Sequence, residues 1–233
     1  MPITGNLTLQ PPALARCPVP RWVIYCSACA FAWLLYAYVD RPASTWMLAH
    51  NEQLPWATIR SILRPFGAGG AQLAILLVVT VLGLWLGKPK IARAGKWILL
   101  AFLITVALTT ALKWAVRRPR PGHMDAPRPT LPVQIDSSEW HSFPSGDVAA
   151  TTSIVVVLWG LMGRPRRWRW LLLIPFLVAT QRFVAARHFP ADIVAGAMLG
   201  AWVGQQTVRR IPPYREWRSV PRRKAKVVAN EPA

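Results

Sequence analysis

Three clusters of charged and polar residues in the second half of the sequence have the types and spacing needed to hold a phosphate group. They are K-W-A-V-R-R-P-R-P at residues 113–121, F-P-S-G-D at 143–147, and R-F-V-A-A-R-H-F-P-A-D at 182–192. Guanidinium groups bind phosphate oxygens in pairs, and a lysine adds a compact positive charge. Lys113, Arg120 and Arg182 together therefore predict a site for an anion, and phosphate fits it best.

The second cluster predicts the start of a helix that faces the same anion. Backbone N–H groups at a helix N-terminus, together with the helix dipole, attract phosphate. The Pro-Ser-Gly turn at residues 144–146 would present such groups. We also expect the Ser145 hydroxyl to cap this helix and to donate a hydrogen bond to the anion.

The third cluster adds a nucleophile, His188. A neutral imidazole can attack phosphorus through one nitrogen when a carboxylate accepts the proton of the other. Pro190 suits the first turn of a helix, which places His188 just before that helix and Asp192 in its first turn. We expect a phosphohistidine at His188 that water hydrolyses. Neither a metal nor another cofactor is expected, since three cations already neutralise the phosphoryl charge.

The elements that position these clusters are six nearly continuous apolar runs in a 233-residue chain that is 53% hydrophobic. Each run is close to the length that spans a bilayer. The runs cover residues 22–39, 71–87, 97–116, 147–162, 170–186 and 190–208. The sequence predicts an all-α, polytopic membrane protein: one domain, 1–233, with a bundle of six transmembrane helices at 22–208 between an N-terminal segment, 1–21, and a basic tail, 209–233.

The first apolar run has a cleaved signal peptide as its alternative interpretation. The run ends in Tyr38-Val39-Asp40-Arg41 rather than in a small-residue cleavage site, which favours an uncleaved helix. The following segment, 41–70, mixes aromatic and aliphatic residues with polar ones and predicts an amphipathic helix at the membrane surface. The cysteines, Cys17, Cys26 and Cys29, predict neither a disulfide framework nor a zinc cluster.

The net charge of +19 is explained largely by membrane topology. With a cytoplasmic N-terminus, 18 of the 28 basic residues fall in cytoplasmic segments, as the positive-inside rule requires. This predicts a multi-pass protein of the inner (plasma) membrane with both termini in the cytoplasm and the three clusters at the periplasmic or outer face. The basic segments favour anionic membrane lipids as partners, and we expect no nucleic-acid partner.

The three clusters together resemble the signature of the type 2 phosphatidic acid phosphatase (PAP2) superfamily, which also includes vanadium haloperoxidases and bacterial acid phosphatases. The signature reads K-x6-R-P, P-S-G-H and S-R-x5-H-x3-D. Lys113, Arg120 and Pro121 match its first part, and the third part is matched except that Gln181 replaces the serine. The six-helix layout is similar to that of the bacterial membrane enzymes of the family.

The resemblance implies a role for each matched position. It implies that His188 is the nucleophile and that Asp192 orients it. It also implies a phosphorylated lipid as the substrate, processed at the outer face. The residues implied to bind the substrate phosphate are Lys113, Arg120, Ser145, Gly146 and Arg182.

The departure from the signature is Asp147, which stands where the family has the histidine that protonates the leaving group. A protonated carboxyl can serve as the general acid. Three outcomes stay open: Asp147 is the acid, His141 or a water replaces it, or the site is slow or altered in use. Since a leaving phosphate needs less protonation than an alkoxide, the replacement favours lipid diphosphates as substrates.

These observations predict a membrane phosphatase that hydrolyses a lipid phosphate or diphosphate at the extracytoplasmic face. The substrates implied by resemblance are undecaprenyl diphosphate, phosphatidylglycerophosphate, phosphatidic acid and the phosphates of lipid A. One alternative is a lipid phosphotransferase that uses the same phosphohistidine. The other is a catalytically impaired relative that only binds lipid phosphates. In the last helix, Gly196, Gly200 and Gly204 predict close packing against a neighbouring helix.

Overall fold

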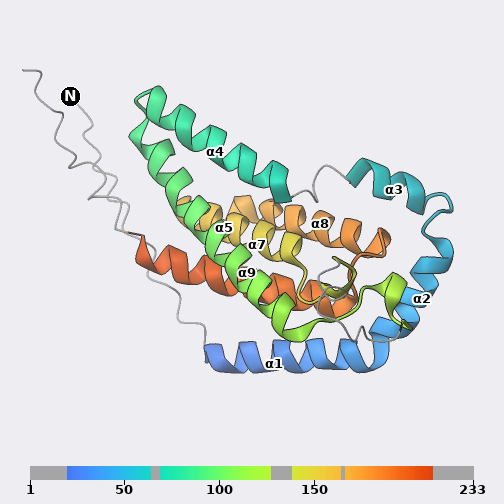
Figure 1. The fold of residues 1–233 in the computed structure, drawn as a ribbon. Helices are drawn as coiled ribbons and strands as arrows, with labels where there is room; N and C mark the ends of the chain where they lie inside the picture. Colours follow the sequence, from blue (N-terminus) through green and yellow to red (C-terminus); the bar gives the residue numbers. More distant parts are fainter. Residues whose placement is uncertain (1–19, 64–68, 127–137, 164–165, 212–233) are drawn as a thin grey trace, which may run out of the picture.

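The computed structural model describes residues 20–63, 69–126, 138–163 and 166–211 of the 233-residue chain (Figure 1). Within these residues helix is the only regular secondary structure, so the predicted all-α class is confirmed. Most of the N-terminal segment and of the basic tail lies outside the described residues, where the predictions for them are not tested.

A helix coincides with each of the six apolar runs. These helices are α1 (Arg21–Leu34), α4 (Gly69–Trp85), α5 (Pro89–Val116), α7 (Gly146–Leu161), α8 (Leu173–Val184) and α9 (Pro190–Arg210). The fifth run differs from the prediction because its first part is a 3-10 helix, η5 (Arg166–Leu172), from which α8 continues. Two shorter 3-10 turns, η3 (Pro121–His123) and η4 (Ser138–Trp140), lie in the connection between α5 and α7.

The first helix extends further than the sequence predicts. After α1 the chain passes through a π-helical turn, η1 (Leu35–Val39), and directly into α2 (Asp40–His50). The single amphipathic helix expected at 41–70 is not formed, and the described part of that segment holds α2 and the short helix α3 (Trp56–Leu63). Pro55 explains the break, because proline has no N–H to donate and disfavours helical backbone at the preceding residue.

Two described segments are long and apolar enough to cross a membrane, Trp22–His50 and Ile91–His123. Ala74–Trp85 and Gly146–Leu161 are apolar but shorter. Many apolar side chains of α1 and α4 point outward, among them Phe31, Trp33, Val78 and Leu82. Exposed apolar faces of this kind suit contact with lipid. The number of six membrane spans stays a prediction.

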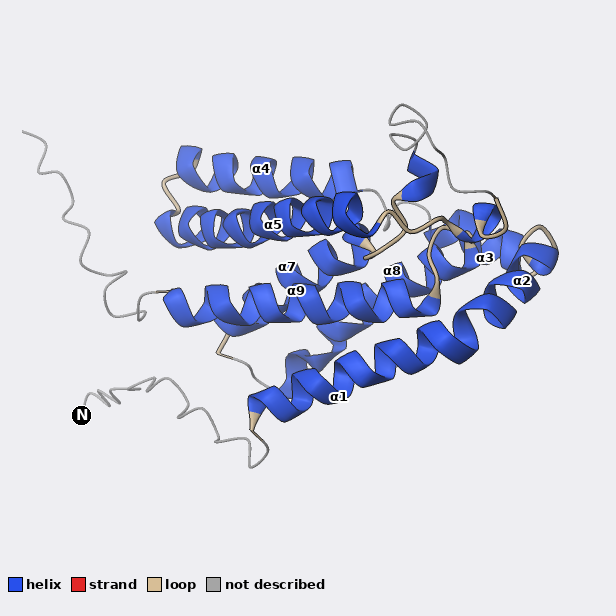
Figure 2. Cartoon of the chain, turned by 60° about the horizontal axis from the view of Figure 1, so that its bottom comes forward, coloured by secondary structure: helices blue, strands red, loops and turns tan. Residues whose placement is uncertain are grey.

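The centre of the bundle is made by α5, α7 and α9, which lie together in Figures 1 and 2, with α4 packed on α5 and α1 along α9. Ile98 and Ala101 of α5, Val157 of α7 and Val203 of α9 form a buried apolar cluster between them. Because the three helices pack along their length, the ends that carry the predicted clusters are held at one end of the bundle.

The close approach of α7 and α9 depends on glycine, as the sequence predicts. A Cβ atom on Gly196 would lie 2.5 Å from the carbonyl oxygen of Ser145, and one on Gly200 would lie 2.1 Å from that of Ala149. These distances are too short for any side chain. Gly196 therefore lets the turn before α7 rest directly on the first part of α9.

Main-chain hydrogen bonds join the three clusters at that end. The N–H of Ser142 donates to the carbonyl of Arg118 over 3.0 Å, and the N–H of Ser145 donates to the carbonyl of Asp192 over 3.0 Å. Helix α5 ends at Val116, and the following residue, Arg117, has a left-handed backbone and donates its N–H to the carbonyl of Lys113. The segments after α5, before α7 and before α9 are therefore tied together by their backbones.

Candidate active site

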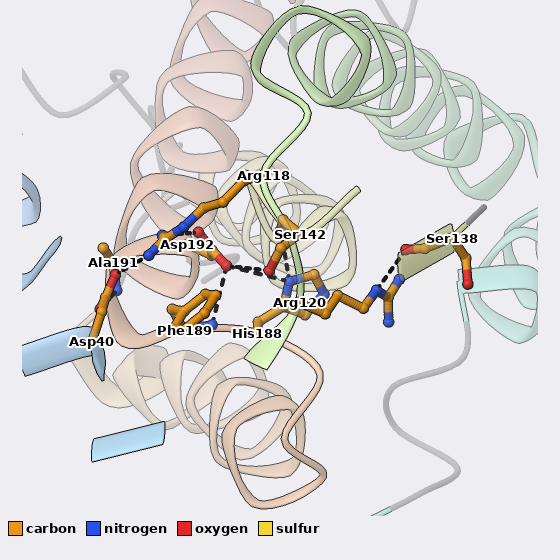
Figure 3. A network of polar contacts seen from close by, with 9 residues as sticks. All are labelled: Asp40, Arg118, Arg120, Ser138, Ser142, His188, Phe189, Ala191 and Asp192. Carbon is orange, nitrogen blue, oxygen red and sulfur yellow. Dashed lines mark hydrogen bonds and ion pairs between the residues drawn. The ribbon is translucent and has the colours of Figure 1, made fainter. Parts of the chain in front are cut away.

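The predicted cations lie next to the start of α7. A Cβ atom on Gly146 would be 3.5 Å from Nζ of Lys113, so the ammonium group faces the Pro-Ser-Gly turn. Arg182, near the end of α8, places Nη2 2.9 Å from Oδ2 of Asp147. Arg120 donates from Nε to the carbonyl of Ser138 over 2.8 Å (Figure 3). The structure thus gathers positive groups from α5, α8 and the loop after α5 around the N-terminus of α7, where an anion is favoured.

Arg120 lies partly buried among like charges. Its pKa is lowered, first by burial and then by the charge of Arg187, while Glu139 acts in the opposite direction. A guanidinium stays charged under all ordinary conditions. Burial itself favours neither sign of charge, but the positive charges of Arg187 and Arg182 also lower this pKa, and an anion bound among these groups would offset their repulsion.

The ring of His188 is buried, and its hydrogen bond defines the tautomer. Its Nδ1 lies 2.8 Å from the main-chain carbonyl oxygen of Ser142 (Figure 3). A carbonyl oxygen only accepts hydrogen bonds, so Nδ1 must carry the proton. In the neutral ring the lone pair is then on Nε2, which makes Nε2 the nucleophilic nitrogen.

The surroundings of His188 favour this neutral ring. Burial is the largest cause that lowers its pKa, followed by the positive charges of Arg120 and Lys113, and its pKa lies well below the usual 6.5. The hydrogen bond to Ser142 acts in the opposite direction but is outweighed. His188 is therefore uncharged at neutral pH and available for nucleophilic attack.

Asp192 is placed differently from the prediction. We expected its carboxylate to accept the His188 proton directly, but its Oδ2 is 3.9 Å from Nδ1. The hydrogen bond from Nδ1 goes to the Ser142 carbonyl instead. Asp192 accepts from the Ser142 hydroxyl over 2.5 Å and from the N–H of Phe189 over 3.0 Å. Asp192 thus holds Ser142, which accepts the hydrogen bond from His188, and Phe189, which follows His188 in the chain.

Ser145 also corrects one prediction. Its hydroxyl makes no capping hydrogen bond to α7. The residue is instead held by its main chain, since its N–H donates to the carbonyl of Asp192 and its carbonyl lies against Gly196. The hydroxyl oxygen is fully buried and has no hydrogen-bond partner among the described residues. An unpartnered buried hydroxyl costs free energy unless a ligand satisfies it. The second predicted role, donation to a bound anion, remains open to this group.

Asp147, the carboxylate that departs from the signature, forms an ion pair with Arg182. Both side chains are partly exposed, at 26% and 18%. His141, the other candidate proton donor, packs its ring against Trp114 with the centroids 5.0 Å apart. Asp147 is therefore the carboxyl that directly contacts one of the predicted phosphate-binding groups.

Sequence reasoning missed three residues that hold the site together: Ser142, Arg118 and Asp40. Ser142 acts through its carbonyl, which every residue type has. Arg118 lies within the first cluster, but its position in the sequence predicts no role for it, although it pairs with Asp192 over 2.5 Å. Asp40 had a usable signal, because a carboxylate at the end of an apolar membrane run needs a partner.

No group of three or more His, Cys, Asp or Glu side chains is arranged to hold a metal ion among the residues that the structure describes. The charges that act on His188 are those of Arg120, Lys113 and Arg182, and the Asp147 and Asp192 carboxylates act on Lys113. The chemistry that follows is therefore derived from these side chains.

Two curated proteins are similar to the core of the chain. A decaprenylphosphoryl-5-phosphoribose phosphatase of Mycobacterium tuberculosis is 29% identical over 130 residues, which cover 55% of this chain and 67% of that protein. An undecaprenyl-diphosphatase of Sulfolobus acidocaldarius is 27% identical over 133 residues, 56% of this chain and 62% of that protein. Both names describe phosphatases, the enzyme class that the sequence predicts.

Two solved structures share the fold. LpxE of Aquifex aeolicus superposes with a TM-score of 0.51 at 25% identity and covers 70% of this chain and 91% of its own. A transmembrane PAP2-type phosphatidylglycerolphosphate phosphatase of Bacillus subtilis gives a TM-score of 0.56 at 19% identity, with 85% and 98% covered. The family model of the PAP2 superfamily matches residues 94–216, more than half of the chain, and this stretch contains all three clusters. The resemblance drawn from the three motifs is thus confirmed, and the chain belongs to the PAP2 superfamily.

Proposed function

We propose that this protein removes a phosphate group from a lipid phosphate or diphosphate at the extracytoplasmic face of the membrane, through a phosphohistidine at His188. One observation carries the proposal: a neutral imidazole, with its proton on Nδ1, lies beside three phosphate-binding cations. The nucleophile and the phosphate-binding side chains then belong to the same site. This is the arrangement that phosphoryl transfer to a histidine requires.

In the first step Nε2 of His188 attacks phosphorus, and the bond from phosphorus to the leaving oxygen breaks. Lys113, Arg120 and Arg182 neutralise the charge on the other phosphoryl oxygens, with the Ser145 hydroxyl and the turn at Gly146 as further donors. The positive charge that develops on the ring is shared through Nδ1–H with the Ser142 carbonyl. Asp192 acts through Ser142 and Phe189, whose positions it holds.

In the second step a water attacks the phosphohistidine. The bond between phosphorus and Nε2 breaks, inorganic phosphate leaves, and the neutral ring is restored. One proton of the water must be accepted, and we assign this role to the Asp147 carboxylate in the first turn of α7, which contacts the phosphate-binding Arg182. The cycle therefore needs a single carboxyl that gives a proton in the first step and takes one in the second.

We assign that carboxyl to Asp147 for substrates whose leaving group is an alkoxide. The unliganded structure pairs Asp147 with Arg182. A phosphoryl group bound to Arg182 would replace the carboxylate there. The released carboxylate would take up a proton, which a phosphate monoester can bring as its monoanion, and the resulting carboxyl would then lie beside the leaving oxygen. A diphosphate needs this proton less, because its leaving group is itself a phosphate. Asp147 thus favours diphosphates over monoesters.

An apolar groove supports a lipid as the rest of the substrate. It has a volume of about 1030 Å³ and runs between α1 and α9, past Trp33, Tyr36 and Met198. Its inner end reaches Phe189, the neighbour of His188. A hydrocarbon chain can lie in such a groove while the phosphate enters the polar site. The relatives' named substrates make polyprenyl phosphates and phosphatidylglycerophosphate the first to test, with phosphatidic acid and lipid A phosphates next.

For the placement in the membrane we propose the six-span arrangement with both termini in the cytoplasm, in the inner (plasma) membrane. The positive-inside distribution of basic residues supports it. So do the outward-facing apolar side chains of α1 and α4. The active site at the end of α5 and the start of α7 would then face the periplasm or the cell exterior.

The test is phosphate release from a panel of these lipids by detergent-purified protein in the presence of a chelator. His188→Asn is compared with His50→Asn, a matched control because Nδ1 of His50 also faces a main-chain carbonyl, that of Trp46, at 2.7 Å. We expect release by the wild type and by His50→Asn but not by His188→Asn. Transfer of label to a second lipid without free phosphate would establish the phosphotransferase instead. Saturable binding without turnover would establish an impaired relative.

A further inference from the structure

Asp40 is a buried carboxylate that joins the first membrane helix to the catalytic loop. Only 2% of its surface is exposed. One oxygen accepts a hydrogen bond from Nη2 of Arg118 over 2.6 Å, and the other accepts from the N–H of Ala191 over 2.9 Å (Figure 3). Ala191 lies between His188 and Asp192 in the sequence. Asp40 therefore holds the segment that carries both the nucleophile and its supporting carboxylate.

Arg118 extends this connection to Asp192. Its Nη1 donates to Oδ1 of Asp192 over 2.5 Å, so one guanidinium bridges two carboxylates. The same guanidinium lies 4.0 Å from the ring centre of Phe189 and 4.8 Å from that of Tyr36. Cation–π contacts on these rings restrict it further. A continuous path of polar contacts thus runs from Asp40 through Arg118 and Asp192 to Ser142. The carbonyl of Ser142 in turn accepts the hydrogen bond from Nδ1 of His188.

The helix is distorted where it supplies Asp40. The π-helical turn Leu35–Val39 ends immediately before this residue. A π turn changes the phase of all later residues, and such turns are frequent at functional sites. Tyr36, four residues earlier and so on the same face of a regular helix, is 59% exposed, whereas Asp40 and Ser44 are each 2% exposed. The distortion therefore directs the carboxylate toward the site although the preceding turns face outward.

Stability alone gives a weak reason for this arrangement. A buried ion pair loses about as much free energy from desolvation as it gains from attraction, and apolar replacements are often neutral. Its geometry, in contrast, is well defined, because one bridging guanidinium and two carboxylates leave few alternative positions. Such a group is suited to fixing the position of its neighbours.

We propose that Asp40 is a positioning residue: through Arg118 and the N–H of Ala191 it sets Asp192, and thereby Ser142 and the attacking position of His188. This inference rests on the proposed phosphohistidine route. Although Asp40 lines the groove proposed for the lipid chain, only 2% of it is exposed, so the inference predicts a larger effect on the rate of phosphoryl transfer than on substrate binding. In addition, the hydrogen bonds that Asp40 accepts come from Arg118 and from the N–H of Ala191, and neither residue is one of the predicted phosphate-binding groups.

The test compares Asp40→Asn, Asp40→Glu and Asp125→Asn. Asp125 is the matched control, because it pairs with Arg41 at the surface and is 66% exposed. We expect Asp40→Asn to lower kcat about 10- to 100-fold, since a displaced nucleophile loses rate on this scale. KM should stay within about threefold. Asp40→Glu keeps the charge and should recover part of kcat. Asp125→Asn should behave as the wild type.

A double-mutant cycle tests whether Asp40 acts through Arg118. The variant that carries both Asp40→Asn and Arg118→Gln should be no slower than the variant with Arg118→Gln alone.

A second measurement does not depend on turnover. Hydrogen exchange should become faster in Asp40→Asn at residues 186–193 and stay unchanged in the middle of α5 and α7. Wild-type kcat together with unchanged exchange in Asp40→Asn would overturn the inference. Faster exchange spread over all helices would also overturn it, since that indicates a general loss of packing. If the wild type releases no phosphate from any lipid, the proposed function fails, and exchange at 186–193 still decides the role of Asp40.

Discussion

Nδ1 of His188 is 2.8 Å from the main-chain carbonyl oxygen of Ser142, which is therefore its direct hydrogen-bond acceptor. The carboxylate of Asp192 lies farther away, at 3.9 Å, and contacts Ser142 and Phe189 instead. No side-chain substitution at residue 142 removes a main-chain carbonyl. Two groups thus orient His188: the main-chain carbonyl of Ser142, which accepts its hydrogen bond, and the carboxylate of Asp192, which holds Ser142 in place.

Substitutions around this acceptor should have graded effects. Ser142→Ala keeps the carbonyl and loses one hydrogen bond to Asp192, so we expect kcat to fall about tenfold. Asp192→Asn weakens the contacts to Ser142, Phe189 and Arg118 together and should lower kcat by about 100-fold or more. Steady-state kinetics of the purified variants measures both. An Asp192→Asn variant that is faster than Ser142→Ala would contradict the role given to Asp192.

Asp147→Asn should separate the two classes of substrate. If the carboxyl protonates an alkoxide, its loss should lower kcat for a phosphate monoester about 100-fold or more, which is the usual contribution of a general acid. For a lipid diphosphate the loss should be less than about tenfold, because a phosphate leaves without a proton. The ratio of the two rates in wild type and variant is the measurement. Equal losses for both substrates would remove Asp147 as the proton donor, and the next candidate would be His141.

The pKa of His188 makes a prediction for stability against pH. In the folded protein the pKa of His188 lies well below 6.5, the usual value for an unfolded histidine. Below pH 6.5 the unfolded chain therefore binds more protons than the folded protein does. The folded state should therefore become steadily less stable as the pH is lowered from 6.5 toward the folded-state pKa. Thermal unfolding at pH 7.5 and 5.5 should show a larger loss for the wild type than for His188→Gln. His50→Gln should retain the wild-type difference. The same loss in all three proteins would contradict the lowered pKa.

The contact between α7 and α9 should tolerate no side chain at Gly200. A methyl group there would lie 2.1 Å from the carbonyl oxygen of Ala149, so the helices must separate. We expect Gly200→Ala to reduce the free energy of unfolding by about 1–3 kcal/mol. Gly122→Ala is the control, because nothing lies within 4 Å of that position. Unfolding temperatures in detergent compare the two. Equal temperatures for both variants would show that α7 and α9 are less closely packed than described here.

Much of the site could be predicted from the sequence because its residue types are unusual where they stand. Lys113, Arg120, Arg182 and His188 are polar groups at the ends of apolar helices, where topology alone does not explain them. Their spacing matches one known pattern. The helices could be predicted for a similar reason, since long apolar runs bounded by proline, glycine and charge leave few alternatives.

What could not be predicted depends on partners that are distant in the sequence or on the main chain. Asp40 meets Arg118 across 78 positions and Ala191 across 151. Ser142 uses its carbonyl as well as its hydroxyl, and a carbonyl leaves no trace in the residue type. The Ser145 hydroxyl was expected to cap α7, but the residue is pressed between Gly196 and the backbone of Asp192. In each case tertiary packing decides between options that local sequence leaves open.

The most direct test of the account is to trap the covalent intermediate. Protein mixed with a lipid phosphate or diphosphate labelled at the terminal phosphorus is quenched in alkali, digested and analysed for a phosphorylated peptide. We predict that the label is on His188, that it disappears during a chase with unlabelled substrate, and that His50→Asn is labelled like the wild type. Turnover by the wild type with no label on His188 at any time, or undiminished turnover by His188→Asn, would contradict the central claim.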